Sequence, residues 1–101
     1  MTGVKKQSLG TDVIMAIAQA KTDLKLNRLA EHRGNMLIDP HAGHHGARLL
    51  EAYVGHGRAN DPLGPAGKRR LVLKIQSGQI SEMYYSNDHY RTGSWVRILD
   101  F

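Results

Sequence analysis

The stretch RLVLKIQSGQISEMYY, residues 70–85, decides the fold class of this 101-residue chain. Residues 70–76 partly alternate between apolar and polar side chains and are rich in strand-forming types, so they predict a β-strand. The turn Ser77-Gly78-Gln79 follows, and residues 80–85 can return antiparallel to the first strand as a hairpin. Residues 94–99 predict a final strand. Three consecutive strands of this kind indicate an antiparallel meander.

The N-terminal part of the chain has a helical pattern. Apolar side chains recur at roughly helical spacing after Asp12, which predicts a helix over residues 11–31, with Thr22-Asp23 as a candidate break. Ser8 or Thr11 can cap its start, and Gly34 is a stop signal. The polar residues 1–10 predict a flexible arm. We therefore expect one α+β domain, residues 1–101, with its N-terminal helix or helices packed on a C-terminal antiparallel sheet.

Two middle segments have weaker patterns. Residues 46–54 fit one side of a helix or a strand, and intrinsic propensity slightly favours the helix. Residues 55–68 contain four glycines and two prolines, which predicts a long loop. Long loops in compact domains often carry function.

The composition excludes several classes of protein. No apolar run reaches the length of a membrane span, so no membrane anchor is expected. The N-terminus lacks the apolar segment of a signal peptide. The chain has no cysteine, which excludes a disulfide framework and a thiolate metal site.

The chain is basic, with 14 Lys and Arg against 9 Asp and Glu and a formal net charge of +5. Such a charge on a small domain favours a polyanionic partner: nucleic acid, anionic lipid or an acidic protein. Ordinary solubilising charge is the alternative explanation. Several basic residues of the C-terminal half fall close together or near the His89 segment, and we expect that half to face the anion; they are Arg58, Lys68, Arg69, Arg70, Lys74, Arg91 and Arg97.

The segment SNDHYRT, residues 86–92, places His89 between Asp88 and Tyr90. An acidic neighbour can hold the tautomer of an imidazole, and a histidine held in this way suits a proton donor. The alternative is a solvated turn that happens to contain a histidine.

Cleavage of RNA through its own 2′-hydroxyl needs a base, a cation and an acid. The chain offers these groups in the carboxylate of Glu51, the basic cluster at residues 68–70 and His89. A base takes the 2′ proton, a cation binds the phosphate oxygens as their charge grows, and an acid protonates the departing 5′ oxygen. Arginine suits the phosphate because its donors match two oxygens. The nucleophile belongs to the substrate, so this reaction requires no metal or other cofactor.

At this point the chain resembles a known family. Arg69-Arg70-Leu71-Val72, the turn at Gly78 and EMYYSNDHYRT at residues 82–92 are similar to the end of the microbial guanyl-specific ribonucleases, the barnase family. The resemblance covers about residues 64–99. Residues 50–54 are similar to the strand that bears the family's catalytic glutamate. More broadly, the chain resembles bacterial ribonuclease toxins of the barnase and RelE type.

The resemblance implies roles for the matching residues. His89 would be the general acid, Glu51 the general base and Arg70 the ligand of the scissile phosphate. Tyr90 would line the site and contact the base or the phosphate. Ala66 stands where the family has another arginine, and Lys68 or Arg69 is the candidate substitute. The substrate-binding set would be Lys68, Arg69, Tyr90, Arg58 and Tyr85.

The resemblance also implies partners and a place of action. RNA would be the substrate, and an acidic immunity or antitoxin protein would cover the basic cleft. The domain would act in the cytoplasm, either as a free-standing toxin or as the C-terminal part of a larger protein delivered into a target cell.

A histidine-rich patch offers an alternative chemistry. His41, His44 and His45 are candidate ligands for zinc or nickel, with His32, His56 and Asp39 nearby. Gly43 and Gly46 argue against a stable helix that would align them. His44 or His45 is also a candidate second acid–base group beside His89.

Two further classes of function do not require catalysis. A nucleic-acid-binding protein would stack bases on aromatic side chains that lie between the arginines. Packing within the sheet is the alternative role of these aromatics, above all of Trp95. They are Tyr84, Tyr85, Tyr90 and Trp95. A phage or plasmid protein that binds a host protein is the other class.

Overall fold

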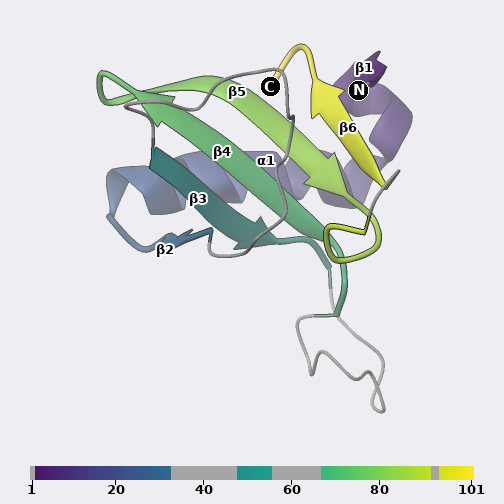
Figure 1. The fold of residues 1–101 in the computed structure, drawn as a ribbon, viewed down its shortest axis with the longest axis horizontal. Helices are drawn as coiled ribbons and strands as arrows, with labels where there is room; N and C mark the ends of the chain where they lie inside the picture. The colour runs from purple at the N-terminus through teal and green to yellow at the C-terminus, as the bar shows by residue number, and fades with distance from the viewer. Residues whose placement is uncertain (1, 33–47, 56–66, 92–93) are drawn as a thin grey trace.

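The computed structural model describes residues 2–32, 48–55, 67–91 and 94–101. In this part of the chain, one α-helix accompanies a six-stranded mixed sheet, so the predicted α+β class is confirmed (Figure 1). The spatial order of the strands is β1-β6-β5-β4-β3-β2. The elements are β1 (Thr2–Val4), η1 (Lys6–Leu9, a 3-10 helix), α1 (Thr11–Lys25), β2 (Ala30–Glu31), β3 (Arg48–Tyr53), β4 (Arg70–Gln76), β5 (Gln79–Ser86) and β6 (Trp95–Ile98).

The central hairpin is confirmed. β4 and β5 pair antiparallel from Arg70 opposite Ser86 to Gln76 opposite Gln79. Between the strands, Ser77 and Gly78 have φ values of 52° and 75°. Two consecutive positive φ values belong to the two-residue turns whose twist matches that of the flanking strands. β6 then pairs antiparallel with β5, which completes the predicted meander.

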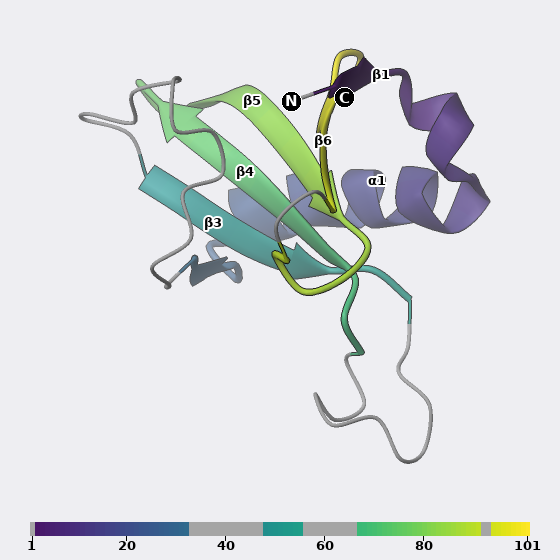
Figure 2. The same cartoon turned by 45° about the vertical axis from the view of Figure 1, so that its right-hand side comes forward.

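The sheet also includes the N-terminus, where the sequence predicted a flexible arm. Residues 2–4 form β1, which pairs parallel with β6 (Figure 2). The Leu99 amide donates to the Val4 carbonyl at 2.8 Å, and the Lys6 amide donates to Asp100 Oδ1 at 2.7 Å. The sheet is therefore mixed rather than purely antiparallel, because β1 runs parallel to β6.

The helix begins at Thr11 as predicted but ends at Lys25, before the predicted residue 31. Gly10, rather than Ser8 or Thr11, occupies the N-cap. The chain turns at Asn27, whose φ is 55°, a conformation that asparagine tolerates better than most residues. Leu29 fitted the helical pattern of the sequence, but it lies in the segment between α1 and β2 and packs against the core from there. No helix in the described residues is long and apolar enough to cross a membrane.

Residues 48–53 form the strand β3, so the slight preference for a helix over residues 46–54 was wrong. β3 pairs with β2 on one side and with β4 on the other. These backbone bonds, and the burial of Leu50 in the core, outweigh the modest helix propensity of the segment.

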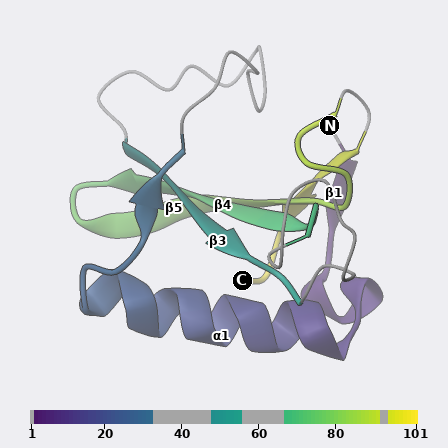
Figure 3. The same ribbon diagram turned by 90° about the horizontal axis from the view of Figure 1, so that it is seen from below.

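The two faces of the sheet differ because successive strand side chains point to opposite sides. One face packs on α1 (Figure 3). This core includes Val13, Ile17 and Ala20 from the helix and Leu50, Leu71, Leu73, Met83 and Ile98 from the strands. The opposite face, here called the open face, carries a smaller apolar cluster made of Val72, Tyr84 and Tyr90, with Leu49 and Trp95 packed against it.

Candidate active site

The register of β3 and β4 places Glu51 and Arg70 on neighbouring strands of the open face. Tyr53 lies opposite Arg70, and Val72 lies opposite Glu51. The Arg70 guanidinium carbon is 4.5 Å from the centre of the Tyr53 ring. Because Arg70 and Glu51 share a face and are diagonal in register, the cation and the carboxylate lie within reach of one ligand.

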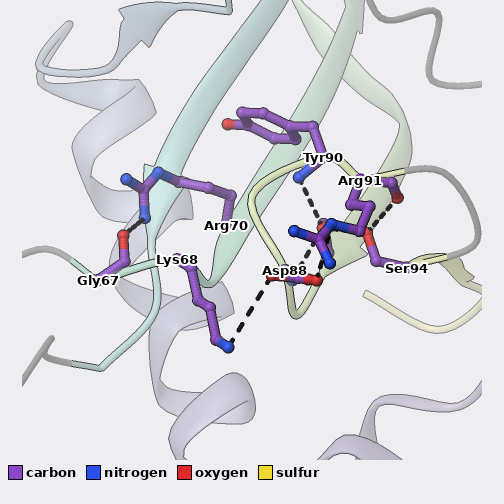
Figure 4. A network of polar contacts seen from close by, with 8 residues as sticks. Gly67, Lys68, Arg70, Asp88, Tyr90, Arg91 and Ser94 are labelled. Carbon is purple, nitrogen blue, oxygen red and sulfur yellow. Dashed lines mark hydrogen bonds and ion pairs between the residues drawn. The ribbon is translucent and has the colours of Figure 1, made fainter. Parts of the chain in front are cut away.

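The Arg70 side chain is held in a fixed orientation. Its Nη1 donates a hydrogen bond to the carbonyl oxygen of Gly67 at 2.7 Å (Figure 4). The same nitrogen donates to the carbonyl oxygen of Arg69 at 2.9 Å. The residue is only 5% exposed. Its guanidinium is therefore a preorganised positive charge rather than a mobile surface group.

Tyr90 connects the loop after β5 to Glu51. Its hydroxyl donates a 2.6 Å hydrogen bond to Glu51 Oε2. The ring stacks on Trp95, with centroids 5.0 Å apart, and meets the His32 ring edge-on at 4.6 Å. Burial, and next the bond to Glu51, raise the pKa of Tyr90 far above its ordinary value. Tyr90 is therefore a hydrogen-bond donor to Glu51 throughout the physiological range of pH.

His32 is a site residue that the sequence did not assign to catalysis; it was considered only as a metal ligand. Its Nδ1 lies 3.5 Å from Glu51 Oε2, and its side chain is 4% exposed. The His32 amide donates to the Leu49 carbonyl at 2.7 Å, which continues the pairing of β2 with β3. Its Nε2 is buried without a hydrogen-bond partner among the described residues. No local pattern could identify His32, because its contact with Glu51 depends on strand pairing.

His89 lies in the loop after β5, at the end of the sheet where Arg70 begins β4. Its amide donates to the Lys68 carbonyl at 2.6 Å, and its exposed imidazole has its centroid 5.0 Å from that of Tyr90. His89 and Tyr90 have φ values of 44° and 69°. Non-glycine residues in such conformations cost about 1–3 kcal/mol each, so neighbouring contacts must hold this loop.

The structure gives the Asp88 carboxylate two partners that the sequence did not suggest. We expected its carboxylate to orient His89, but Oδ1 lies 3.9 Å from Lys68 Nζ and Oδ2 lies 3.3 Å from Arg91 Nε (Figure 4). Asp88 thus pairs with two cations at the rim of the site. Lys68 remains largely exposed beside the His89 loop, where it can meet an anion.

Arg69 and Tyr85, both expected to bind substrate, lie on the helix side of the sheet. Arg69 Nε donates to the Tyr85 hydroxyl at 2.8 Å, and Nη1 donates to the Asp12 carboxylate at the start of α1. The hydrogen bond between Arg69 and Asp12 raises the pKa of the former and lowers that of the latter. The structure therefore does not bring Arg69 and Tyr85 together with Glu51. The alternation of side chains along the chain sends Arg69 and Arg70 to opposite faces.

Several predicted residues lie outside the described ranges. They are the predicted helix stop Gly34, Arg58, Ala66, and the histidine patch with its neighbours, His41, Gly43, His44, His45, Gly46, His56 and Asp39. Among the residues that the structure describes, no three His, Asp or Glu side chains gather closely enough to hold a metal ion.

No protein-family model, curated protein or solved structure matches this chain. The open face brings together a carboxylate, a buried guanidinium, an exposed imidazole and a buried phenol at one end of the sheet.

Proposed function

We propose that this protein is a metal-independent endoribonuclease with its active site on the open face of a barnase-like sheet. The 2.6 Å hydrogen bond from Tyr90 to Glu51 carries the proposal. It joins the loop that contains His89 to the strand that contains Glu51. Arg70 lies on the neighbouring strand, diagonal to Glu51 in register. These contacts support a site to which three separate segments would contribute a carboxylate, an imidazole and a guanidinium.

In the proposed reaction, Glu51 removes the proton of a ribose 2′-hydroxyl, and the 2′ oxygen attacks the adjacent phosphorus. The bond from phosphorus to the 5′ oxygen of the next nucleotide breaks, and His89 donates a proton to that oxygen. Arg70 stabilises the negative charge that develops on the phosphate. The products are a 2′,3′-cyclic phosphate and a free 5′-hydroxyl.

The test is cleavage of an RNA oligonucleotide in EDTA by wild type and by His89→Ala. Wild type should produce 2′,3′-cyclic phosphate ends, and the variant should be slower by about a hundredfold or more. An oligonucleotide with 2′-deoxyribose at the scissile position should resist cleavage. Asn87→Ala, an exposed position in the same loop, is the matched control. Wild-type rates in His89→Ala, or cleavage of the deoxy substrate, would contradict the proposal.

Tyr53 favours a second candidate function, RNA binding without cleavage. The residue is 57% exposed, and its ring lies against the Arg70 guanidinium. An exposed aromatic backed by a cation is suited to stacking a base. In that case wild type would leave RNA intact. His89→Ala would bind it as tightly as wild type, and the affinity would fall steeply with added salt.

The proposal includes an acidic immunity or antitoxin partner and action in the cytoplasm of a target cell. The net charge of +5 supports electrostatic steering of such a partner. Expression of the wild-type domain should arrest growth, and co-expression of the partner gene should restore it. Normal growth with the domain alone would contradict this part.

A further inference from the structure

Ser86 lies at the centre of the hydrogen bonds that hold the His89 loop. It is fully buried at the end of β5, opposite Arg70 on β4. Ser86 Oγ accepts hydrogen bonds from the amide of Tyr90 at 3.0 Å and from the amide of Asp88 at 3.3 Å. These two residues flank His89, so one hydroxyl holds the backbone on both sides of the imidazole.

The hydroxyl proton of Ser86 also has a defined acceptor. Ser94 Oγ donates to the Arg91 carbonyl at 2.6 Å. Because the Ser94 hydroxyl proton is used in that bond, Ser94 Oγ accepts the hydrogen bond from Ser86 Oγ, 2.7 Å away. Hydrogen bonds thus run from Ser86 to Ser94 and from Ser94 to the Arg91 carbonyl. Figure 4 shows Ser94 beside Arg91. With two bonds accepted and one donated, the Ser86 hydroxyl uses its full bonding capacity.

This arrangement supports a backbone that is unfavourable by itself. His89 and Tyr90 both have a positive φ, which residues other than glycine rarely adopt. Such a conformation persists only where its surroundings over-determine it. Two of the hydrogen bonds that hold this conformation, from the amides of Asp88 and Tyr90, are accepted by Ser86 Oγ.

We infer that Ser86 is a positioning residue, whose hydroxyl sets the direction in which the His89 imidazole projects relative to Glu51 and Arg70. The catalytic consequence rests on the proposed function, whereas the effect on the loop does not. A proton donor displaced by a fraction of an ångström still allows substrate to bind but slows the chemical step.

Ser86→Ala removes the hydroxyl with little change in volume. Ser81→Ala makes the same change at an exposed position of β5, where the hydroxyl donates to the Lys74 carbonyl. The measurements are hydrogen exchange of the Asp88 and Tyr90 amides, and kcat and KM on an RNA oligonucleotide. In Ser86→Ala, we expect both amides to exchange about tenfold faster. We also expect kcat to fall about tenfold to a hundredfold, with KM nearly unchanged. Ser81→Ala should match wild type, and Ser86→Thr, which keeps the hydroxyl, should restore both readouts.

Amide exchange and kcat in Ser86→Ala equal to those of Ser81→Ala would overturn the inference. If wild type cleaves no RNA, the proposed function fails, and amide exchange still decides the role of Ser86. If Ser86→Ala does not fold, Ser94→Ala removes the acceptor of the Ser86 proton instead. Faster exchange of the Tyr90 amide in that variant would support the inference, and unchanged exchange would refute it.

Discussion

The hydroxyl of Tyr90 donates a 2.6 Å hydrogen bond to Oε2 of Glu51, a residue 39 positions earlier in the sequence. His32 Nδ1 approaches the same oxygen at 3.5 Å. Among the described residues, both contacts to this carboxylate fall on one oxygen. Within the proposed function, Tyr90 therefore holds Glu51; the contact with the base or phosphate that the family resemblance implied stays a prediction.

Tyr90→Phe removes the hydroxyl and keeps the ring between His32 and Trp95. A hydrogen bond to a charged group contributes about 1.5–3 kcal/mol, so urea unfolding should show a loss of this size. We expect kcat on RNA to fall about tenfold because Glu51 loses its fixed orientation. Tyr85→Phe makes the same change on the helix side and should keep kcat. Equal kcat in Tyr90→Phe and wild type would argue against the role of Tyr90.

His32→Leu and Tyr90→Phe should not be additive. Each variant leaves Glu51 one donor, whereas the double variant leaves this half-buried carboxylate with neither. The cycle compares the unfolding free energies of wild type, the two single variants and the double variant. The double variant should be less stable than the sum of the two single losses predicts, by about 0.5–3 kcal/mol. A coupling energy near zero would mean that the 3.5 Å contact of His32 contributes nothing.

The ion pair between Asp12 and Arg69 should make stability depend on pH. The hydrogen bond from Arg69 lowers the pKa of Asp12 below its ordinary 3.8. The pair therefore stabilises the fold above the unfolded-state pKa, and this contribution is lost as pH falls through the lowered value. Asp12→Asn should be less stable than wild type at pH 7, and the difference should shrink at pH 2–3. A difference that stays constant over this range would contradict the pairing. Activity should be unaffected, because the pair lies on the helix side.

Leu71→Ala tests the core between the sheet and α1. Leu71 is fully buried, so its truncation should cost about 2–5 kcal/mol in urea unfolding. Met15→Ala, on the exposed side of the helix, should cost no more than about 0.5 kcal/mol. A small loss for Leu71→Ala would mean that the helix does not cover this face in solution.

Local sequence patterns predicted the central part of this fold. The turn at Ser77-Gly78 and the strands on either side of it follow from turn chemistry and strand-forming residues within a short window. Residues 2–4 and 30–31 could not be found in this way. Strands of two or three residues have no period to detect, and they form here only because β6 and β3 offer partners. β3 itself was ambiguous because its residues suit a helix nearly as well.

By itself, the sequence determined the chemical inventory: His89, Glu51 and Arg70, a basic charge and no cysteine. It could not determine which side chains face one another. Arg69 and Arg70 are adjacent, yet one binds Asp12 beside the helix and the other lies over Tyr53 on the open face. A shift of one residue along a strand reverses the face. The contacts of His32 and Tyr90 with Glu51 were likewise decided by the tertiary structure, because strand pairing joins segments whose local patterns carry no record of their partners.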